Sequence, residues 1–401
     1  MNRNIAAFVT IAGVLCATAT AAAAADAEPT KADAFEELSS FAQVDLSLPA
    51  SPAFAVLGLS PDKVERPTSL RTLAATALHS IGENGKPVNG VAIDATPILL
   101  ISPGTITAGD GYAGSNPQDD LSWKNYWKRF LTRTTVSLAT TSADTAGASR
   151  MAWGLRVGLI DQADPGLFFQ KTVQCLQDPN TSAGPIPAKR KQGSEPANPK
   201  LETCLSDSSK KPELTGPPLW ARFSLYVGYG QSWYSKSGAV TDDAPDTKTV
   251  WLVASKGLTS DSVETSPGHL RALIQGYVER KVNDRAADPN NANALLTQNS
   301  TQGIVRLKFG SANTHVFSEV GLSKVRLGNS TTENLHHVAL GAEFNVGKAL
   351  SLGSSGMETW IQLASVQERG FSNGKDQTGV ALSLKFGAPF LDIPGGGSAG
   401  K

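Results

Sequence analysis

Histidine is the side chain best suited to acid–base chemistry near neutral pH, and the chain has five of them: His79, His269, His315, His336 and His337. None of these stands in a serine-hydrolase elbow, an HExxH motif or another catalytic spacing. His336 and His337 follow Glu333 at the expected start of a strand, which indicates an interfacial polar cluster. We therefore predict no catalytic residue and no enzyme activity.

Acidic side chains offer no metal site either. The pairs Asp119–Asp120 and Asp242–Asp243 lie in expected loops, where solvated turns explain them better than a calcium site. The cysteines form no CxxC motif and no Cys/His ligand cluster. We predict neither a metal site nor a cofactor.

The cysteines indicate a disulfide instead. Cys16 lies in the segment that export is expected to remove, which leaves Cys175 and Cys204. An even pair in an oxidising compartment predicts a bridge, which would close a loop of 30 residues. Restricting the unfolded chain in this way is worth about 3.5 kcal/mol. Two unpaired thiols in a loop are the alternative.

A third set of chemically active residues consists of polar side chains at alternate positions within otherwise apolar or small segments. We predict that these residues line the inside of a barrel: Arg129, Arg133, Arg156, Arg222, Tyr226, Glu279, Arg306, Lys308, Glu319, Glu343 and Lys385. An open pore with this lining would carry a mild positive field and favour anions. In the alternative, the lumen is plugged and Arg–Glu pairs hold the wall together.

Segments with a period of two must position these side chains, because alternation of apolar with polar or small residues is the signature of strands. Val380, Leu382 and Leu384, for example, alternate with Ala381 and Ser383. Eleven such segments occur, at about 90–101, 127–141, 149–160, 219–235, 247–257, 269–282, 302–310, 314–327, 335–347, 357–368 and 378–390.

The length of these segments separates two β architectures. Strands of soluble β-sandwiches average five or six residues, whereas an outer-membrane barrel needs tilted strands of about nine to eleven. Most of the segments are long, so we predict an all-β fold: an antiparallel transmembrane β-barrel over residues 88–390. Because single-chain bacterial barrels have even strand numbers, we expect about 12 strands, with Leu167–Leu176 as the best candidate for the missing one.

The remaining segments are expected to flank or interrupt the barrel. Residues 1–27 have the charged start, the short apolar stretch and the small residues of a signal peptide, which is too short for a spanning helix. Residues 28–87 form a leader or plug segment, in which helical spacing predicts a short helix over 69–81. The insertion 161–218 is expected to be a long surface loop, and 391–401 a flexible tail.

The leader also carries a resemblance to a known group. Its sequence Ser51–Pro61, followed by Val64–Ser69, resembles the Pro-bounded leader of uncharacterised outer-membrane β-barrel proteins of Gram-negative bacteria. Gly90–Asp94 looks like the first strand of that group. The resemblance implies a barrel and a location in the cell outer membrane, reached through the signal peptide, but no established activity. It also implies membrane lipid and the barrel-insertion machinery as partners.

The charge balance limits the remaining choices. The chain has 36 Lys and Arg against 36 Asp and Glu, and this zero net charge argues against nucleic acid as a partner. The first function that we predict is a narrow channel or passive transporter for small solutes. The alternatives are a structural or surface-binding barrel, with a plugged lumen and loops that bind a partner, and a lipid-modifying barrel enzyme.

Overall fold

The computed structural model describes the strand-forming part of the chain and one leader segment. The described residues are 51–57, 73–81, 87–97, 130–142, 148–163, 219–236, 239–240, 247–258, 271–288, 291–311, 314–328, 332–346, 358–370 and 377–387. The predicted signal peptide, the Cys175–Cys204 bridge, Arg129, the tail 391–401 and nearly all of the loop 161–218 lie outside them.

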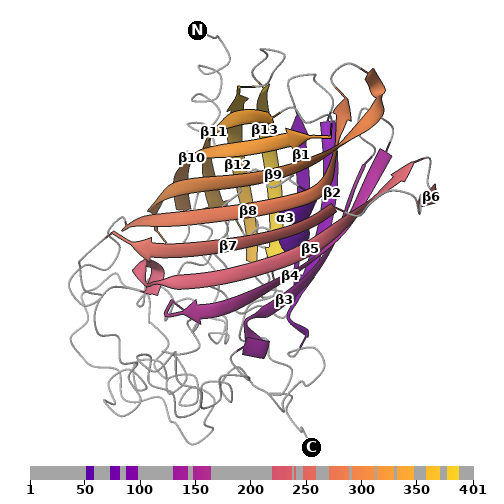
Figure 1. Cartoon of the computed structure of the whole chain (residues 1–401). Coiled ribbons are helices and arrows are strands. Elements are labelled where there is room, and N and C mark those ends of the chain that lie inside the picture. Colours follow the sequence, from indigo (N-terminus) through magenta and orange to yellow (C-terminus); the bar gives the residue numbers. More distant parts are fainter. Residues whose placement is uncertain are drawn as a thin grey trace, which may run out of the picture.

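Twelve antiparallel strands form one closed ring (Figure 1). Their bounds are β1 Leu73–Ile81, β2 Pro87–Ala95, β3 Thr134–Thr141, β4 Ala148–Asp161, β5 Ser224–Lys236, β7 Thr247–Gly257, β8 Arg271–Asp288, β9 Asn291–Gly310, β10 Thr314–Leu327, β11 Thr332–Asn345, β12 Glu358–Arg369 and β13 Gln377–Gly387. Each strand pairs with its neighbour in the chain, and β13 pairs with β1 to close the ring. The two-residue strand β6, Ala239–Val240, pairs with β5 at its end. The predicted antiparallel barrel of about 12 strands is confirmed.

The barrel has its polar residues inside and its apolar residues outside. Outward-facing apolar side chains are widely exposed, among them Leu138, Val320, Leu322 and Leu340. Buried polar and charged side chains occupy the alternate positions, as Glu319 does in β10 and Glu343 in β11. Because the strand period is two, one face of every strand turns to the lumen and the other to the surroundings.

The twelfth strand is β1, which corrects the predicted helix over 69–81. The apolar residues with helical spacing do not form a helix here, and Leu73–Ile81 instead pairs on both sides, with β2 and with β13. Without β1, two strands would keep unpaired backbone edges in the wall, which a lipid-facing barrel cannot tolerate. The barrel therefore starts at residue 73, not at 88, and the ring is complete without Leu167–Leu176, which lies outside the described residues.

The two rims of the barrel differ in their connections. One rim, here called the short-turn rim, joins β8 to β9 across residues 289–290 and β10 to β11 across 328–331. The other rim carries the start of β1, the end of β13 and the long connections from β2 to β3 and from β4 to β5. The even strand number explains why both ends of the barrel leave from the same rim.

Two short helical segments accompany the strands. The α-helix α3, Pro52–Leu57, belongs to the leader, and the 3₁₀ turn η2, Leu219–Ala221, precedes β5. The leader therefore does contain a short helix, at a different place from the predicted one. Among the described residues, no helix is long and apolar enough to cross a membrane.

The outer wall leads to a stability prediction. Leu340 faces outward and is 61% exposed. If it faces lipid, Leu340→Arg destabilises the barrel by about 2–4 kcal/mol, because a charge near the bilayer midplane is costly. Urea unfolding of the protein in lipid vesicles measures this, with Leu340→Ala as the uncharged control. A cost within about 0.5 kcal/mol of the control is the value for an ordinary water-exposed site and would contradict a lipid-facing wall.

Candidate functional site in the barrel lumen

The leader helix α3 lies inside the barrel. Figure 1 shows it behind the strands of the near wall, and each of its six residues is buried. It contacts β2, β3, β4, β5 and β7. Its apolar side chains form one buried cluster with wall residues that include Ala92, Ala139, Ala152 and Trp251. The segment Ser51–Leu57, here called the plug, therefore occupies one side of the lumen.

Glycines in the wall make room for the plug. A Cβ atom on Gly154 would come within 2.7 Å of the backbone carbonyl carbon of Pro52. A Cβ on Gly230 would lie 2.4 Å from the Val56 Cγ2 atom, and one on Gly90 would lie 3.0 Å from the Phe54 ring. Larger residues at Gly154 and Gly230 would thus overlap the plug. These glycines are here called the glycine seat.

Polar contacts hold the two ends of the plug. At its start, the Ser51 hydroxyl donates a hydrogen bond of 2.5 Å to the Asp94 carboxylate. At its end, one Arg150 nitrogen donates to the Leu57 carbonyl oxygen at 3.1 Å, and the other pairs with Asp284 at 3.1 Å. The plug is thereby fastened to β2, β4 and, through Arg150, β8.

A buried ion-pair cluster fills the opposite side of the lumen, on β9, β10 and β11. Arg306 donates to Glu319 at 2.8 Å through Nε, and its Nη2 atom lies 2.7 Å from the same oxygen. The other Glu319 oxygen lies 3.1 Å from His337 Nε2. Arg306 also lies over the Phe317 ring, 4.3 Å from its centroid. Since Glu319 is 0% exposed, these partners offset its desolvation.

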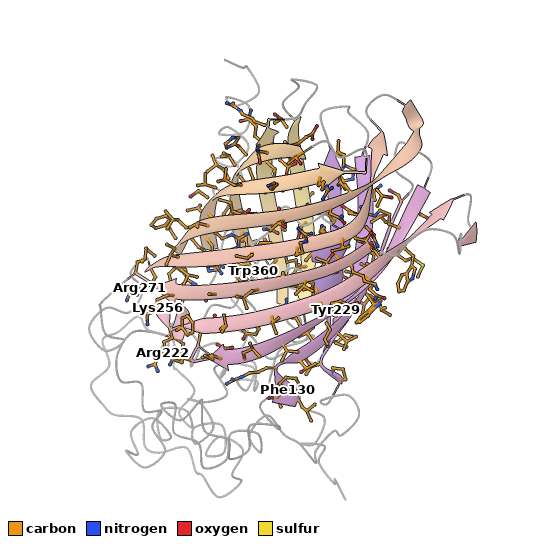
Figure 2. All side chains as sticks on the ribbon, viewed as in Figure 1. Phe130, Arg222, Tyr229, Lys256, Arg271 and Trp360 are labelled. Atoms are coloured by element: carbon orange, nitrogen blue, oxygen red, sulfur yellow. The ribbon has the colours of Figure 1, made fainter. Side chains whose placement is uncertain are left out.

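A second cluster surrounds Glu343 in β11. Lys308 and Lys385 approach its two carboxylate oxygens at 3.4 and 3.3 Å, and His315 Nδ1 lies at 3.6 Å. The His315 ring is itself stacked on Trp360, at 5.4 Å between ring centroids, and on Trp220 at 6.0 Å. Figure 2 shows Trp360 inside the barrel. This cluster joins β9, β10, β11 and β13 along one side of the lumen.

A third cluster lies on β8 and β9. Glu279 accepts hydrogen bonds from Gln302 at 2.6 Å and from the Tyr277 hydroxyl at 2.5 Å, while Lys281 Nζ lies 3.7 Å away. Carboxylates in all three clusters are paired with bases or hydrogen-bond donors. No group of three or more His, Cys, Asp or Glu side chains in the described part of the chain could hold a metal ion.

The structure places most of the predicted lumen residues inside the barrel and brings several together. Arg156, Arg306, Lys308 and Lys385 are buried, as are Glu279, Glu319 and Glu343. Arg133 and Tyr226 meet near the rim opposite the short-turn rim, where Arg133 donates to the Asp161 carbonyl at 3.3 Å and the Tyr226 hydroxyl donates to the Asp161 carboxylate.

Arg222 is different from the other predicted residues. It lies before β5, near the end of the barrel, and is only half-buried (Figure 2). Partial burial lowers the pKa of Arg222 to about 10, because desolvation disfavours its charged form. It is still protonated at neutral pH, so it contributes positive charge to the rim and not to the centre of the lumen.

Sequence reasoning missed the residues that define the plug site. Asp94 and Arg150 were not among the predicted lumen residues, although alternation with the outward Ile93 and Met151 places both inside. His315 and His337 also have this signal. The contacts of the plug with the glycine seat have no local signal, because they join residues more than thirty positions apart.

Besides the ion pairs, the lumen contains buried polar atoms that can still form hydrogen bonds. Both amide atoms of Gln275 and Gln362 are buried and have no hydrogen-bond partner among the described residues. The indole nitrogens of Trp251 and Trp360 are in the same situation. Buried polar groups are normally satisfied by protein or water, so these atoms are suited to contact water or a polar solute.

Comparison with known proteins gives likeness in structure but not in sequence. No family model matches the chain, and no curated protein matches its sequence. The chain is similar to a structure described as KdgM porin, with 8% identity, a TM-score of 0.32, and coverage of 78% of this chain and 98% of that one. It is also similar to the β domain of the Bordetella autotransporter BrkA, with 9% identity, a TM-score of 0.33, and coverage of 80% and 99%.

A third similar structure is described as a bacterial polysaccharide outer membrane secretin, with 9% identity, a TM-score of 0.32, and coverage of 79% of this chain and 99% of that one. The three structures are described differently, as a porin, an autotransporter β domain and a secretin. These descriptions name no single family, and the evidence for the barrel is its strand pairing.

The Arg306–Glu319 pair gives a prediction about the wall. Arg306→Met or Glu319→Leu alone leaves one buried charge without its partner, so each destabilises the protein by about 3–5 kcal/mol. The double variant removes both charges and is expected to regain most of that loss. Urea unfolding of the four proteins in detergent gives the coupling between the two sites. Losses that simply add in the double variant would contradict a direct pair.

Proposed function

We propose that the protein is an outer-membrane β-barrel with a narrow passage for small solutes, which the plug keeps closed. The observation that carries this proposal is the complete burial of Ser51–Leu57 inside the lumen, against glycines that fit it. A helix of six residues belongs to the leader and not to the wall. It can therefore leave the lumen without breaking any strand pair.

The outer wall supports the location. Large apolar side chains are exposed on neighbouring strands, for example Val316 and Val320 in β10 and Val338 and Leu340 in β11. In water, apolar surface of this extent would drive association. In a membrane it matches the lipid, and the closed ring leaves no strand edge unpaired in the hydrocarbon.

The interior supports a hydrated passage with a weak preference for anions. Among the described residues, the buried bases are Arg133, Arg156, Arg271, Lys281, Arg306, Lys308 and Lys385, and the buried acids are Asp94, Asp161, Glu279, Glu319 and Glu343. Seven bases against five acids give this fully buried part of the lining a small positive excess. A polar lining with this sign favours negatively charged solutes once the plug has moved.

A permanently plugged barrel that acts through its loops is the second candidate. The observation that favours it is the three buried clusters, which line one side of the lumen from β8 to β13 and would narrow a passage even without the plug. Neither candidate includes a catalytic step. The partners of the described histidines include carboxylates, an amide and aromatic rings, at Glu319, Glu343, Asn89, Trp220 and Trp360.

Conductance of the protein in planar bilayers tests the proposal. Gly154→Val places a side chain where the Pro52 backbone lies, and backbone at 2.7 Å cannot move aside cheaply. We expect this variant to displace the plug and to conduct in long openings with a reversal potential that indicates anions. The unchanged protein is expected to remain closed for most of the recording.

Gly276→Val is the matched control, because a Cβ at Gly276 meets nothing within 4 Å. It should behave as the unchanged protein does. Heat-modifiable migration on gels verifies that all three proteins are folded. Closure by the plug would be contradicted if the unchanged protein conducts steadily and Gly154→Val conducts to the same extent. If none of the folded proteins conducts, the result would favour the permanently plugged barrel.

A further inference from the structure

The exposed charges on the described part of the outer wall have a single sign. None of the described Asp and Glu side chains is exposed. Among the side chains whose exposure the structure describes, the exposed charged ones are all basic: Lys248, Lys256, Arg280, Lys324, Arg326 and Arg369. The chain as a whole has equal numbers of acids and bases, so this separation is a property of the fold and not of the composition.

Five of these six bases gather toward the short-turn rim. We call Lys248, Arg280, Lys324, Arg326 and Arg369, together with the exposed His336, the basic collar. Strand register places Arg280 of β8 level with Thr301, Thr301 level with Lys324 of β10, and His336 of β11 level with Arg369 of β12. Lys256 is the exception, because it lies near the other end of β7.

Below the collar the wall is apolar. Along β10, Lys324 and Arg326 are followed toward the middle of the strand by the exposed Leu322 and Val320. On β11 and β12, His336, Arg369, Gln367 and Val338 line a groove of about 480 Å³ that opens on the outer surface. The groove therefore has His336 and Arg369 at one end, and Val338 and Gln367 level with each other at the other end.

We propose that the basic collar binds the head group of a lipid that carries two phosphates on a disaccharide, which is the chemistry of lipid A. Lys and Arg near a membrane surface attract anionic lipid, and Arg guanidinium groups bind phosphate oxygens through paired hydrogen bonds. The groove and the apolar wall beneath it receive acyl chains. This inference rests on the membrane location proposed above.

The spacing of the collar favours two separated phosphates. Arg280 and Lys324 stand in one register row on strands β8 and β10, with β9 between them. Two strand spacings put their backbones about 10 Å apart, and the Arg280 guanidinium donates a hydrogen bond of 2.6 Å to the Thr301 hydroxyl on β9. A phosphorylated disaccharide presents a phosphate at each end, whereas the phosphates of cardiolipin are joined through one glycerol and lie closer together.

Native mass spectrometry of the purified full chain in nonionic detergent tests the site. Diphosphoryl lipid A is the probe, and monophosphoryl lipid A and cardiolipin are the comparison lipids. We expect diphosphoryl lipid A to bind more tightly than either. Lys324→Gln and Arg369→Gln should each weaken its binding about fivefold, and the double variant about 25-fold, with a smaller loss at high salt.

Lys256→Gln is the matched control, since it removes an exposed base from the opposite end of the wall. It should leave binding unchanged. The proposal is overturned if this control weakens binding of diphosphoryl lipid A as much as the collar variants do. It is also overturned if monophosphoryl lipid A or cardiolipin binds at least as tightly as diphosphoryl lipid A. Outer-membrane fractionation of the same variants tests the location separately, so that a failure of the site and a failure of the location are distinguishable.

Discussion

The whole structure depends on one constraint, which is the closure of a strand ring whose side chains alternate in direction. Pairing of β1 with β13 removes the last free backbone edge, and the ring then has only an inside and an outside. Every residue along a strand must belong to one or the other. The apolar wall, the polar lumen and the outward direction of the collar side chains all follow from this division.

A ring of twelve strands encloses more space than small wall side chains can fill. The chain fills this space in two ways. On β2 to β5, wall residues such as Gly90, Ala92 and Gly154 are small, and the plug supplies the bulk. On β8 to β13, long charged side chains supply it themselves, in clusters around Glu279, Glu319 and Glu343. The two halves of the barrel differ in whether the lumen can open there, because a leader segment can move out while the side chains of the wall stay attached to their strands.

Period-two alternation was sufficient to predict most of the barrel. All eleven predicted segments overlap strands, and most bounds shift by no more than seven residues, but β9 begins at Asn291, well before the predicted start at 302. The inward positions of Arg156, Arg306 and Lys385 follow from the same pattern. The exception is β1, where the residues of Leu73–Ile81 fit a helix and a strand about equally well. Pairing with its two neighbours, β2 and β13, makes this segment a strand, and a short stretch of sequence does not contain both of them.

The candidate site was less predictable, for a related reason. Charge at an alternate position indicates a lumen residue, but it does not say which acid meets which base across the ring. The plug is harder still, because Pro52–Leu57 is a short apolar run whose burial depends on glycines in three different strands. A glycine in a strand indicates that another part of the protein comes close to the backbone there. It does not indicate which segment of the chain that is.

The most direct test of the account is whether the plug is seated in the lumen of the protein in its own membrane. In a background without Cys175 and Cys204, we would introduce Val56→Cys with Gly230→Cys, whose side chains would touch, and Val56→Cys with the outward Gly276→Cys as the control. After mild oxidation of intact outer membranes, peptide mapping should find the bridge between positions 56 and 230 in most molecules and none between 56 and 276. Absence of the first bridge in a folded, membrane-inserted barrel would contradict the central claim.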